Sequence, residues 1–180
     1  MDSFENVIRL LLEEENYWVR QSEKIRLTEA EKRATGKPSI PRPEIDLVAL
    51  DFEQNQVLAL EVKSYLDSSG VRYEMLCTEH EGLTKGRYKL FTSPNYRSIV
   101  FNRLRQDFMA DGLANEETKF VLGLAAGNVY KNRSDEIRVY FQEQGWFFWG
   151  PEDIKTRLAK LAKKRYENNP VVITAKLLLR

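Results

Sequence analysis

Cysteine and histidine are almost missing from this chain, which has one of each among its 180 residues. The single Cys77 excludes an intramolecular disulfide and suits a reducing compartment. One cysteine and one histidine are also too few to build a structural zinc site. Because Cys77 lies only three residues from His80, we expect a small packing side chain there rather than a catalytic thiol. The chemistry of this protein must therefore come from other residue types.

The chain also lacks a net charge and a long apolar segment. Its 28 basic and 27 acidic residues leave a formal charge of +1, which neither supports nor excludes nucleic-acid binding. The longest apolar run, residues 120–127, is too short to span a bilayer, and acidic residues interrupt the first apolar stretch. We therefore expect a cytoplasmic protein with no membrane partner. Its length and 42% hydrophobic content predict one compact domain over residues 1–180.

Two short apolar runs in the first third of the chain carry three charged residues. Asp46 lies inside the run 45–50, and the run 57–60 ends in Glu61-Val62-Lys63. Both runs are short, aliphatic and bounded by polar residues, so they are predicted to be adjacent, largely buried strands. Charge in such strands is costly unless a cation or a hydrogen-bonding partner compensates it.

Strand geometry predicts where these charges meet. Side chains alternate along a strand, so Glu61 and Lys63 share one face. A hairpin centred on residues 53–54 would place Asp46 opposite Glu61, about 5 Å away at the Cβ atoms. Mg²⁺ would offset their repulsion, because it binds one or two carboxylates and keeps several waters. The simpler alternative is an ion pair of Lys63 with either acid, but the apolar, consecutive strands favour a site.

The segments Arg42-Pro43-Glu44-Ile45-Asp46 and Glu61-Val62-Lys63-Ser64 resemble the PD-(D/E)XK nucleases, which include restriction endonucleases and Holliday-junction resolvases. The resemblance covers residues 1–65 closely and the remainder only in the order of elements. It implies an α/β restriction-endonuclease-like fold, with a mixed central β-sheet flanked by α-helices. It also implies that Asp46, Glu61 and the Val62 carbonyl oxygen bind Mg²⁺ or Mn²⁺, while Lys63 positions or activates the attacking water. One departure is Ile45 directly before Asp46, with Pro43 displaced upstream.

A third acid is expected from a helix that opens the chain. Its apolar stripe has helical spacing and consists of Phe4, Val7, Ile8, Leu11 and Leu12. Glu5 lies at the border of this stripe, and members of the superfamily often add a glutamate from the first helix. The resemblance therefore favours Glu5 as a catalytic acid and metal ligand, with Glu15 as a weaker alternative. An acid that complements the helix macrodipole explains Glu5 equally well.

Four residues are candidates for contacts with DNA. Ser64 and Tyr65 follow Lys63 directly, and loops at the carboxyl ends of strands tend to meet the ligand. Arg103 is a polar residue of a helix expected over residues 96–109. Lys155 belongs to a basic helix expected to start near residue 151. Turn residues and solvated helix faces are the alternative explanations. A weaker nucleic-acid signal comes from basic residues next to an aromatic one, namely Lys85, Arg87, Tyr88 and Lys89.

The other elements are predicted from the same patterns. Further strands are expected at residues 23–27, 119–126, 136–142 and 146–149. The segment 71–94 is predicted to be irregular, and the basic helix to end near residue 166. The apolar run 171–179 is expected either to dock on the rest of the chain or to form a homodimer.

The functional expectation is a nuclease that hydrolyses DNA with Mg²⁺, using Asp46, Glu61, Lys63 and Glu5. The alternative is a catalytically inactive domain of the same fold, which acts as a nucleic-acid-binding or assembly module. The intact set of two acids and a lysine argues against this alternative, because a structural protein gains little from charges inside apolar strands.

Overall fold

The computed structural model of the chain describes residues 2–37, 39–80 and 87–179. The fold is α/β, with a five-stranded sheet in the order β1-β2-β3-β4-β5. The strands are β1 (Trp18–Lys24), β2 (Glu44–Asp51), β3 (Gln56–Lys63), β4 (Lys119–Ala126) and β5 (Phe147–Trp149). The first three strands pair antiparallel and the last three pair parallel. This mixed sheet, flanked by helices, confirms the predicted fold class.

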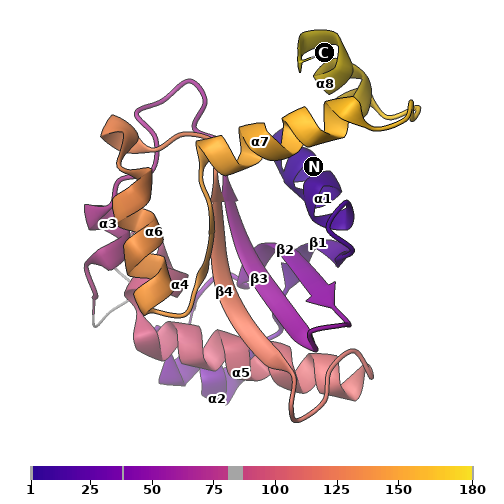
Figure 1. Cartoon of the computed structure of the whole chain (residues 1–180). Helices are drawn as coiled ribbons and strands as arrows, with labels where there is room; N and C mark the ends of the chain where they lie inside the picture. The colour runs from indigo at the N-terminus through magenta and orange to yellow at the C-terminus, as the bar shows by residue number, and fades with distance from the viewer. Residues whose placement is uncertain (1, 38, 81–86, 180) are drawn as a thin grey trace.

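Helices cover both faces of the sheet (Figure 1). One face carries α1 (Ser3–Glu13) and α7 (Pro151–Lys163), and the other carries α5 (Pro94–Ala110) and α6 (Ser134–Glu143). The shorter elements are α2 (Glu29–Ala34), α3 (Glu74–Cys77), α4 (Lys89–Thr92), η1 (Tyr130–Asn132) and α8 (Pro170–Leu179). Within the described ranges, none of these helices has the length and apolar character needed to cross a membrane.

The hairpin of β2 and β3 has the predicted register. Asp51 closes its turn, because the carboxylate Oδ1 accepts hydrogen bonds from the backbone N–H groups of Glu53 and Gln54 at 3.0 and 2.9 Å. The ladder pairs Leu47 with Leu60 at its other end. Continued by one residue, this register brings Asp46 opposite Glu61, as the sequence predicted.

Strand β3 is buried on both faces, which explains its continuous apolar run. Residues 57–60 of this strand each expose 1% or less of their surface. Leu58 and Leu60 pack in the core below α1, while Val57 and Ala59 pack in the core below α5. Central strands of this kind carry apolar residues at every position. The charged residues begin only where the strand reaches the end of these cores.

The strand predicted at residues 136–142 is wrong, because this segment lies in helix α6. Ile137, Val139 and Phe141 alternate as in a strand, but Ile137 and Phe141 are also one helical turn apart. Both are buried, whereas Val139 is 55% exposed. Parallel strands need a crossover connection, and α6 connects β4 to the parallel strand β5.

Several predicted boundaries also shift. The edge strand expected at residues 23–27 is β1, Trp18–Lys24, and a stretch expected to be a connection contains α2. Described parts of the segment 71–94 form α3 and α4, while Lys85 lies outside the described residues. Helix α7 ends at Lys163 rather than near residue 166. The apolar run at the end forms α8, which docks on α7 by burying Val172 and Ala175.

Candidate functional site

The structure brings Asp46, Glu61, Val62 and Lys63 together at one end of the sheet. The Lys63 ammonium nitrogen lies 2.9 Å from Asp46 Oδ2 and 3.0 Å from Glu61 Oε2. It also donates to the carbonyl oxygen of Val62 at 3.1 Å. The three charged side chains expose only 18–24% of their surface. Three of the four predicted metal-ligating residues, Asp46, Glu61 and Val62, therefore place an oxygen against one cationic atom.

The backbone of β3 fixes the Asp46 side chain in this position. The Val62 N–H donates to Asp46 Oδ2 at 2.7 Å, just beyond the last regular pair of the β2–β3 ladder. The carboxylate thus takes the place of a backbone acceptor and ties the start of β2 to the end of β3. Asp46 is held by two donors, the Val62 amide and the Lys63 ammonium. Its orientation is consequently set by the sheet itself.

A close approach at Gly127 brings helix α1 to this end of the sheet. The Gly127 N–H donates to the carbonyl oxygen of Lys63 at 2.9 Å. A Cβ atom at residue 127 would lie 2.5 Å from the Ser64 carbonyl oxygen and 2.9 Å from the ring of Phe4. Only a glycine at residue 127 lets this residue, the Ser64 carbonyl group and the Phe4 ring approach one another so closely. Because Phe4 precedes Glu5, this contact also positions the acid of the first helix.

Burial and neighbouring charges shift the pKa values of the site in a consistent way. Burial alone would lower the pKa of Lys63, but the Glu61 and Asp46 carboxylates outweigh it and raise this pKa above its ordinary value. Burial raises the pKa of Glu61, Lys63 opposes this, and the negative charge of Asp46 adds to it. Lys63 is therefore a firmly protonated ammonium, which suits it to hold negative charge and not to take a proton from water.

Of the two candidate acids from the start of the chain, Glu5 lies on α1 and is the one near the site. Burial raises the pKa of Glu5, and the next largest contribution is the negative charge of Asp46. Glu15 instead accepts a hydrogen bond from Arg157 of α7 at 2.7 Å, beyond the other end of α1. The structure therefore brings Glu5, and not Glu15, close to Asp46.

The predicted DNA contacts divide into two groups. Ser64 and Tyr65 follow β3 directly, and the Tyr65 hydroxyl accepts a hydrogen bond from Tyr88 at 3.3 Å. Arg103 instead binds the Glu31 carboxylate of α2 through two nitrogens, with a shortest distance of 2.7 Å. The Lys155 ammonium lies 2.8 Å from Glu152 on the same helix. The structure places neither of these two cations in contact with Asp46 or Glu61.

A hollow beside Glu61 contains residues that the sequence analysis did not assign to the site. Its volume is about 230 Å³, and its lining includes Glu61, Arg87, Tyr88, Lys89 and Tyr96. Burial, together with the nearby charge of Glu61, raises the pKa of Tyr96 to about 12. The basic and aromatic residues at positions 87–89 were the only sequence signal for this hollow. Tyr96 gave no signal, because it looks like an ordinary residue in the first turn of α5.

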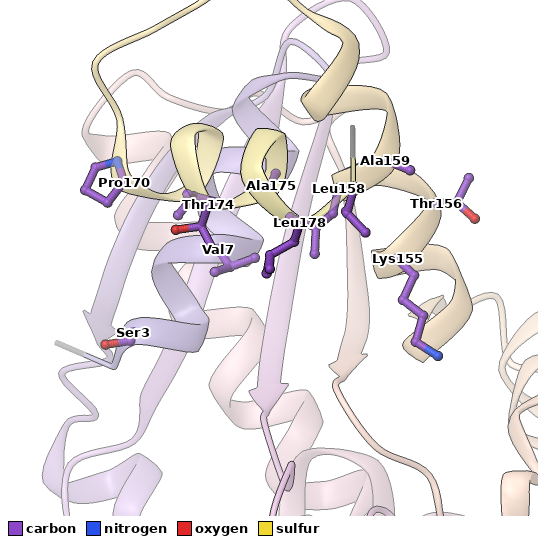
Figure 2. Close-up of a pocket in the computed structure, with 12 residues that line it drawn as sticks. Ser3, Val7, Lys155, Thr156, Leu158, Ala159, Pro170, Thr174, Ala175 and Leu178 are labelled. Carbon is purple, nitrogen blue, oxygen red and sulfur yellow. The ribbon is translucent and has the colours of Figure 1, made fainter.

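A larger hollow lies elsewhere and lacks comparable chemistry. Its volume is about 760 Å³, and it lies between the start of α1, α7 and α8. Figure 2 shows its lining, which includes Val7, Leu158 and Leu178. Lys155 is the one charged residue of this lining. The charged cluster at Lys63 is therefore the stronger candidate for a catalytic site.

The site has the ligand chemistry that Mg²⁺ requires, although its acids are few. No group of three or more histidine, cysteine, aspartate or glutamate side chains among the described residues is arranged to hold a metal ion. Asp46 and Glu61 supply two carboxylates, and Val62 supplies a carbonyl oxygen. Such a hard-oxygen set fits Mg²⁺, which keeps several waters. Comparisons with family models, curated proteins and solved structures found no match to this chain.

Proposed function

We propose that this protein hydrolyses phosphodiester bonds of DNA with Mg²⁺ as cofactor, for which Mn²⁺ can substitute. The observation that carries the proposal is the convergence of three oxygens, from Asp46, Glu61 and Val62, on the ammonium of Lys63. This cation-binding arrangement lies at the end of two apolar strands, where a purely structural role would favour uncharged residues. The sequence resemblance to PD-(D/E)XK nucleases supports the same assignment.

In this proposal Asp46, Glu61 and the Val62 carbonyl oxygen would hold Mg²⁺, with Glu5 as an additional nearby carboxylate. The bound ion would stabilise charge on the phosphate and lower the pKa of a bound water. The Val62 N–H keeps the Asp46 carboxylate oriented by its 2.7 Å hydrogen bond. The protonated Lys63 binds a phosphate oxygen or orients the attacking water. Ser64 and Tyr65, next to Lys63 in the chain, are proposed to contact the DNA backbone.

The proposal extends to partners beyond one DNA molecule. Enzymes that cut both strands commonly act as homodimers, and α8 ends in three exposed leucines at positions 177–179. These leucines form an apolar surface that a second copy of the chain could cover. Arg103 and Lys155 remain candidate DNA contacts, which would require their ion pairs with Glu31 and Glu152 to open.

One observation favours the second candidate function, a domain of this fold that binds nucleic acid without hydrolysing it. Lys63 already neutralises Asp46 and Glu61 at 2.9 and 3.0 Å, so the cluster is satisfied as an ion-pair network. A network of this kind can persist for structural reasons alone. The two functions therefore differ in whether a divalent ion can displace the ammonium from these oxygens.

Cleavage assays separate the two functions. Plasmid, single-stranded and branched DNA would be incubated with the native chain and either Mg²⁺ or Mn²⁺. We expect Asp46→Asn to lower the cleavage rate about a thousandfold or more, because the metal-binding charge is lost while the side chain keeps its shape. Glu53→Gln, in the exposed turn at the other end of the hairpin, is the matched control and should cleave normally. A native chain as inactive as Asp46→Asn on every substrate would support the non-hydrolytic function.

A further inference from the structure

We propose that one unpaired strand of the nucleic acid reaches the site along a track formed by Arg87, Arg42 and Arg26. This inference rests on the proposed function and adds the class of substrate, namely DNA with a single-stranded segment. We call these three residues the arginine track. Arg26 and Arg42 carried no nucleic-acid signal in the sequence, whereas Arg87 belongs to the basic and aromatic stretch at positions 85–89 that gave a weak one.

The track follows three hollows that adjoin one another. The hollow beside Glu61, of about 230 Å³, shares Pro43 with a second hollow of about 330 Å³. The second hollow shares Arg26 and Arg42 with a third, of about 530 Å³, along the β1 edge of the sheet. Arg87 lines the first hollow. The shared lining residues make the three hollows neighbours, in a row from a carboxylate of the site to the edge of the sheet.

The arginines of the track are available to bind an anion. None of the three forms an ion pair or a side-chain hydrogen bond with any residue in the part of the chain that the structure describes. Arg26 and Arg42 are both exposed, and a backbone hydrogen bond from Ile25 N–H to the Pro43 carbonyl oxygen, at 2.9 Å, aligns their neighbours. Two adjacent like charges repel each other, and a phosphate between them would relieve that repulsion.

The charge of the lining favours a polyanion most strongly in the middle of the track. The charged residues of the second hollow are all basic, namely Arg26, Lys32 and Arg42. Acids line the first and third hollows, namely Glu44, Glu61, Glu23, Asp107 and Asp111. Of these, Glu23 pairs with Arg20 and Asp107 with Arg103. The backbone of a nucleic acid would therefore contact the middle hollow with phosphates and approach Glu61 only at the bond to be cut.

The size of the first hollow indicates a single strand. Its volume of about 230 Å³ is below the ~300–1,000 Å³ typical of small-molecule sites, so it can hold one base or one sugar-phosphate unit. A duplex cannot enter a hollow of this size. Tyr96 lines the same hollow and offers an aromatic ring on which a base can stack regardless of sequence. We therefore infer preference for DNA structure over base sequence.

Binding without hydrolysis tests this inference separately from the proposed function. A labelled single-stranded oligonucleotide and the corresponding duplex would be titrated by fluorescence anisotropy in EDTA, at several salt concentrations. We expect tighter binding of the single strand. Arg26→Gln and Arg42→Gln should each weaken this binding roughly tenfold at low salt. Each should also make the plot of log affinity against log salt shallower by about 0.7.

Lys119→Gln is the matched control, because Lys119 is exposed and lies at the end of β4 away from Lys63. It removes one positive charge and should leave affinity and salt dependence unchanged. Equal binding of single-stranded RNA would support the track, since phosphate is the shared ligand. Native affinity in both arginine variants, an equal loss in Lys119→Gln, or preference for duplex would each overturn the inference. Binding through these arginines without cleavage under Mg²⁺ or Mn²⁺ would contradict only the proposed function.

Discussion

The ammonium of Lys63 lies within 3.1 Å of each of the three oxygens proposed to bind Mg²⁺. A lysine and a divalent cation at the same position must compete, because both need the same lone pairs. Lys63 therefore has two opposing effects at this site. It keeps the charges of Asp46 and Glu61 compensated in their buried position, and under the proposed function it would have to move away from these oxygens for Mg²⁺ to bind.

Lys63→Ala should make this competition visible. Removal of the ammonium leaves two facing carboxylates without a counter-charge, so we expect the free energy of unfolding to fall by about 1–3 kcal/mol without metal. Mg²⁺ should then raise the thermal unfolding midpoint more in Lys63→Ala than in the native chain, although cleavage is lost. Thermal unfolding followed by circular dichroism, with and without Mg²⁺, measures both effects.

The double variant Lys63→Ala/Glu61→Gln is the control for this prediction. It removes one of the two carboxylates that would hold the ion, so the extra stabilisation by Mg²⁺ should disappear. An equal Mg²⁺ shift in the native chain and both variants would mean that the ion binds elsewhere. That result would count against Asp46 and Glu61 as ligands.

The individual residues of the site differ in how well sequence could place them. Asp46, Glu61 and Lys63 were predictable, because alternation along a strand and one short hairpin determine which side chains meet. Arg103 was not, because its partner Glu31 is distant in sequence and belongs to another element. Whether a surface cation is paired depends on contacts between elements, which a local pattern does not contain.

Among the elements, the start of α1 and the chain just beyond β3 and β4 meet in close contact at Gly127, beside the site. Gly127→Ala should place a methyl group against the Ser64 carbonyl oxygen and the Phe4 ring, at 2.5 and 2.9 Å. We expect a loss of about 1–3 kcal/mol in stability from overpacking. We also expect a fall in cleavage rate at temperatures where the variant is folded, because the end of β3 and the start of α1 must move apart. Unfolding and cleavage would be measured on the same preparation.

Gly112→Ala separates a general loss of stability from a change in the site. Gly112 has a φ of +71°, and nothing lies within 4 Å of an added Cβ atom. The variant should therefore lose about 1 kcal/mol through backbone strain alone and cleave at the native rate. If Gly127→Ala also cleaved at the native rate while folded, the contact would have no role in positioning the site.

The misreading of α6 as a strand has one physical cause. Helix α6 has an apolar pattern that satisfies both the strand and the helix period, so the local sequence of residues 136–142 is ambiguous. The parallel pairing of β4 with β5 decides in favour of a helix. Parallel strands need a crossover connection, and a β-hairpin joins only antiparallel strands. By contrast, β2 and β3 are joined by a turn that the sequence specifies directly, and their prediction was confirmed.

For the molecule as a whole, a formal charge of +1 conceals an uneven distribution. The acids of the site gather around Lys63, whereas the middle of the arginine track is lined by basic residues. A composition near neutrality is therefore compatible with strong local binding of a polyanion. The phosphates of a nucleic acid interact mainly with protein charges that lie within about a Debye length of them. The overall charge reveals neither the acidic cluster around Lys63 nor the basic middle of the arginine track.

The stability of the folded chain should fall at alkaline pH, because three buried or partly buried groups at the site, Tyr96, Tyr88 and Lys63, have raised pKa values. The pKa of Tyr96 rises from its ordinary 10.0 to about 12, through burial and the charge of Glu61. Burial and the Tyr65 hydroxyl likewise raise the pKa of Tyr88, and the carboxylates raise that of Lys63. A group with a raised pKa contributes its full stability below its unfolded value and loses it as the pH rises through its folded value.

For Tyr96, this stability should be complete below pH 10 and lost between pH 10 and about 12. Tyr96→Phe should therefore lose less stability over this range, measured as the thermal unfolding midpoint at increasing pH. Tyr166→Phe is the control, since Tyr166 is 71% exposed, and it should follow the native chain. Phenolate absorbance of the folded native chain and of Tyr96→Phe gives the titration of Tyr96 directly. Titration of this tyrosine at its ordinary value would show that its hydroxyl is in water and not in the hollow beside Glu61.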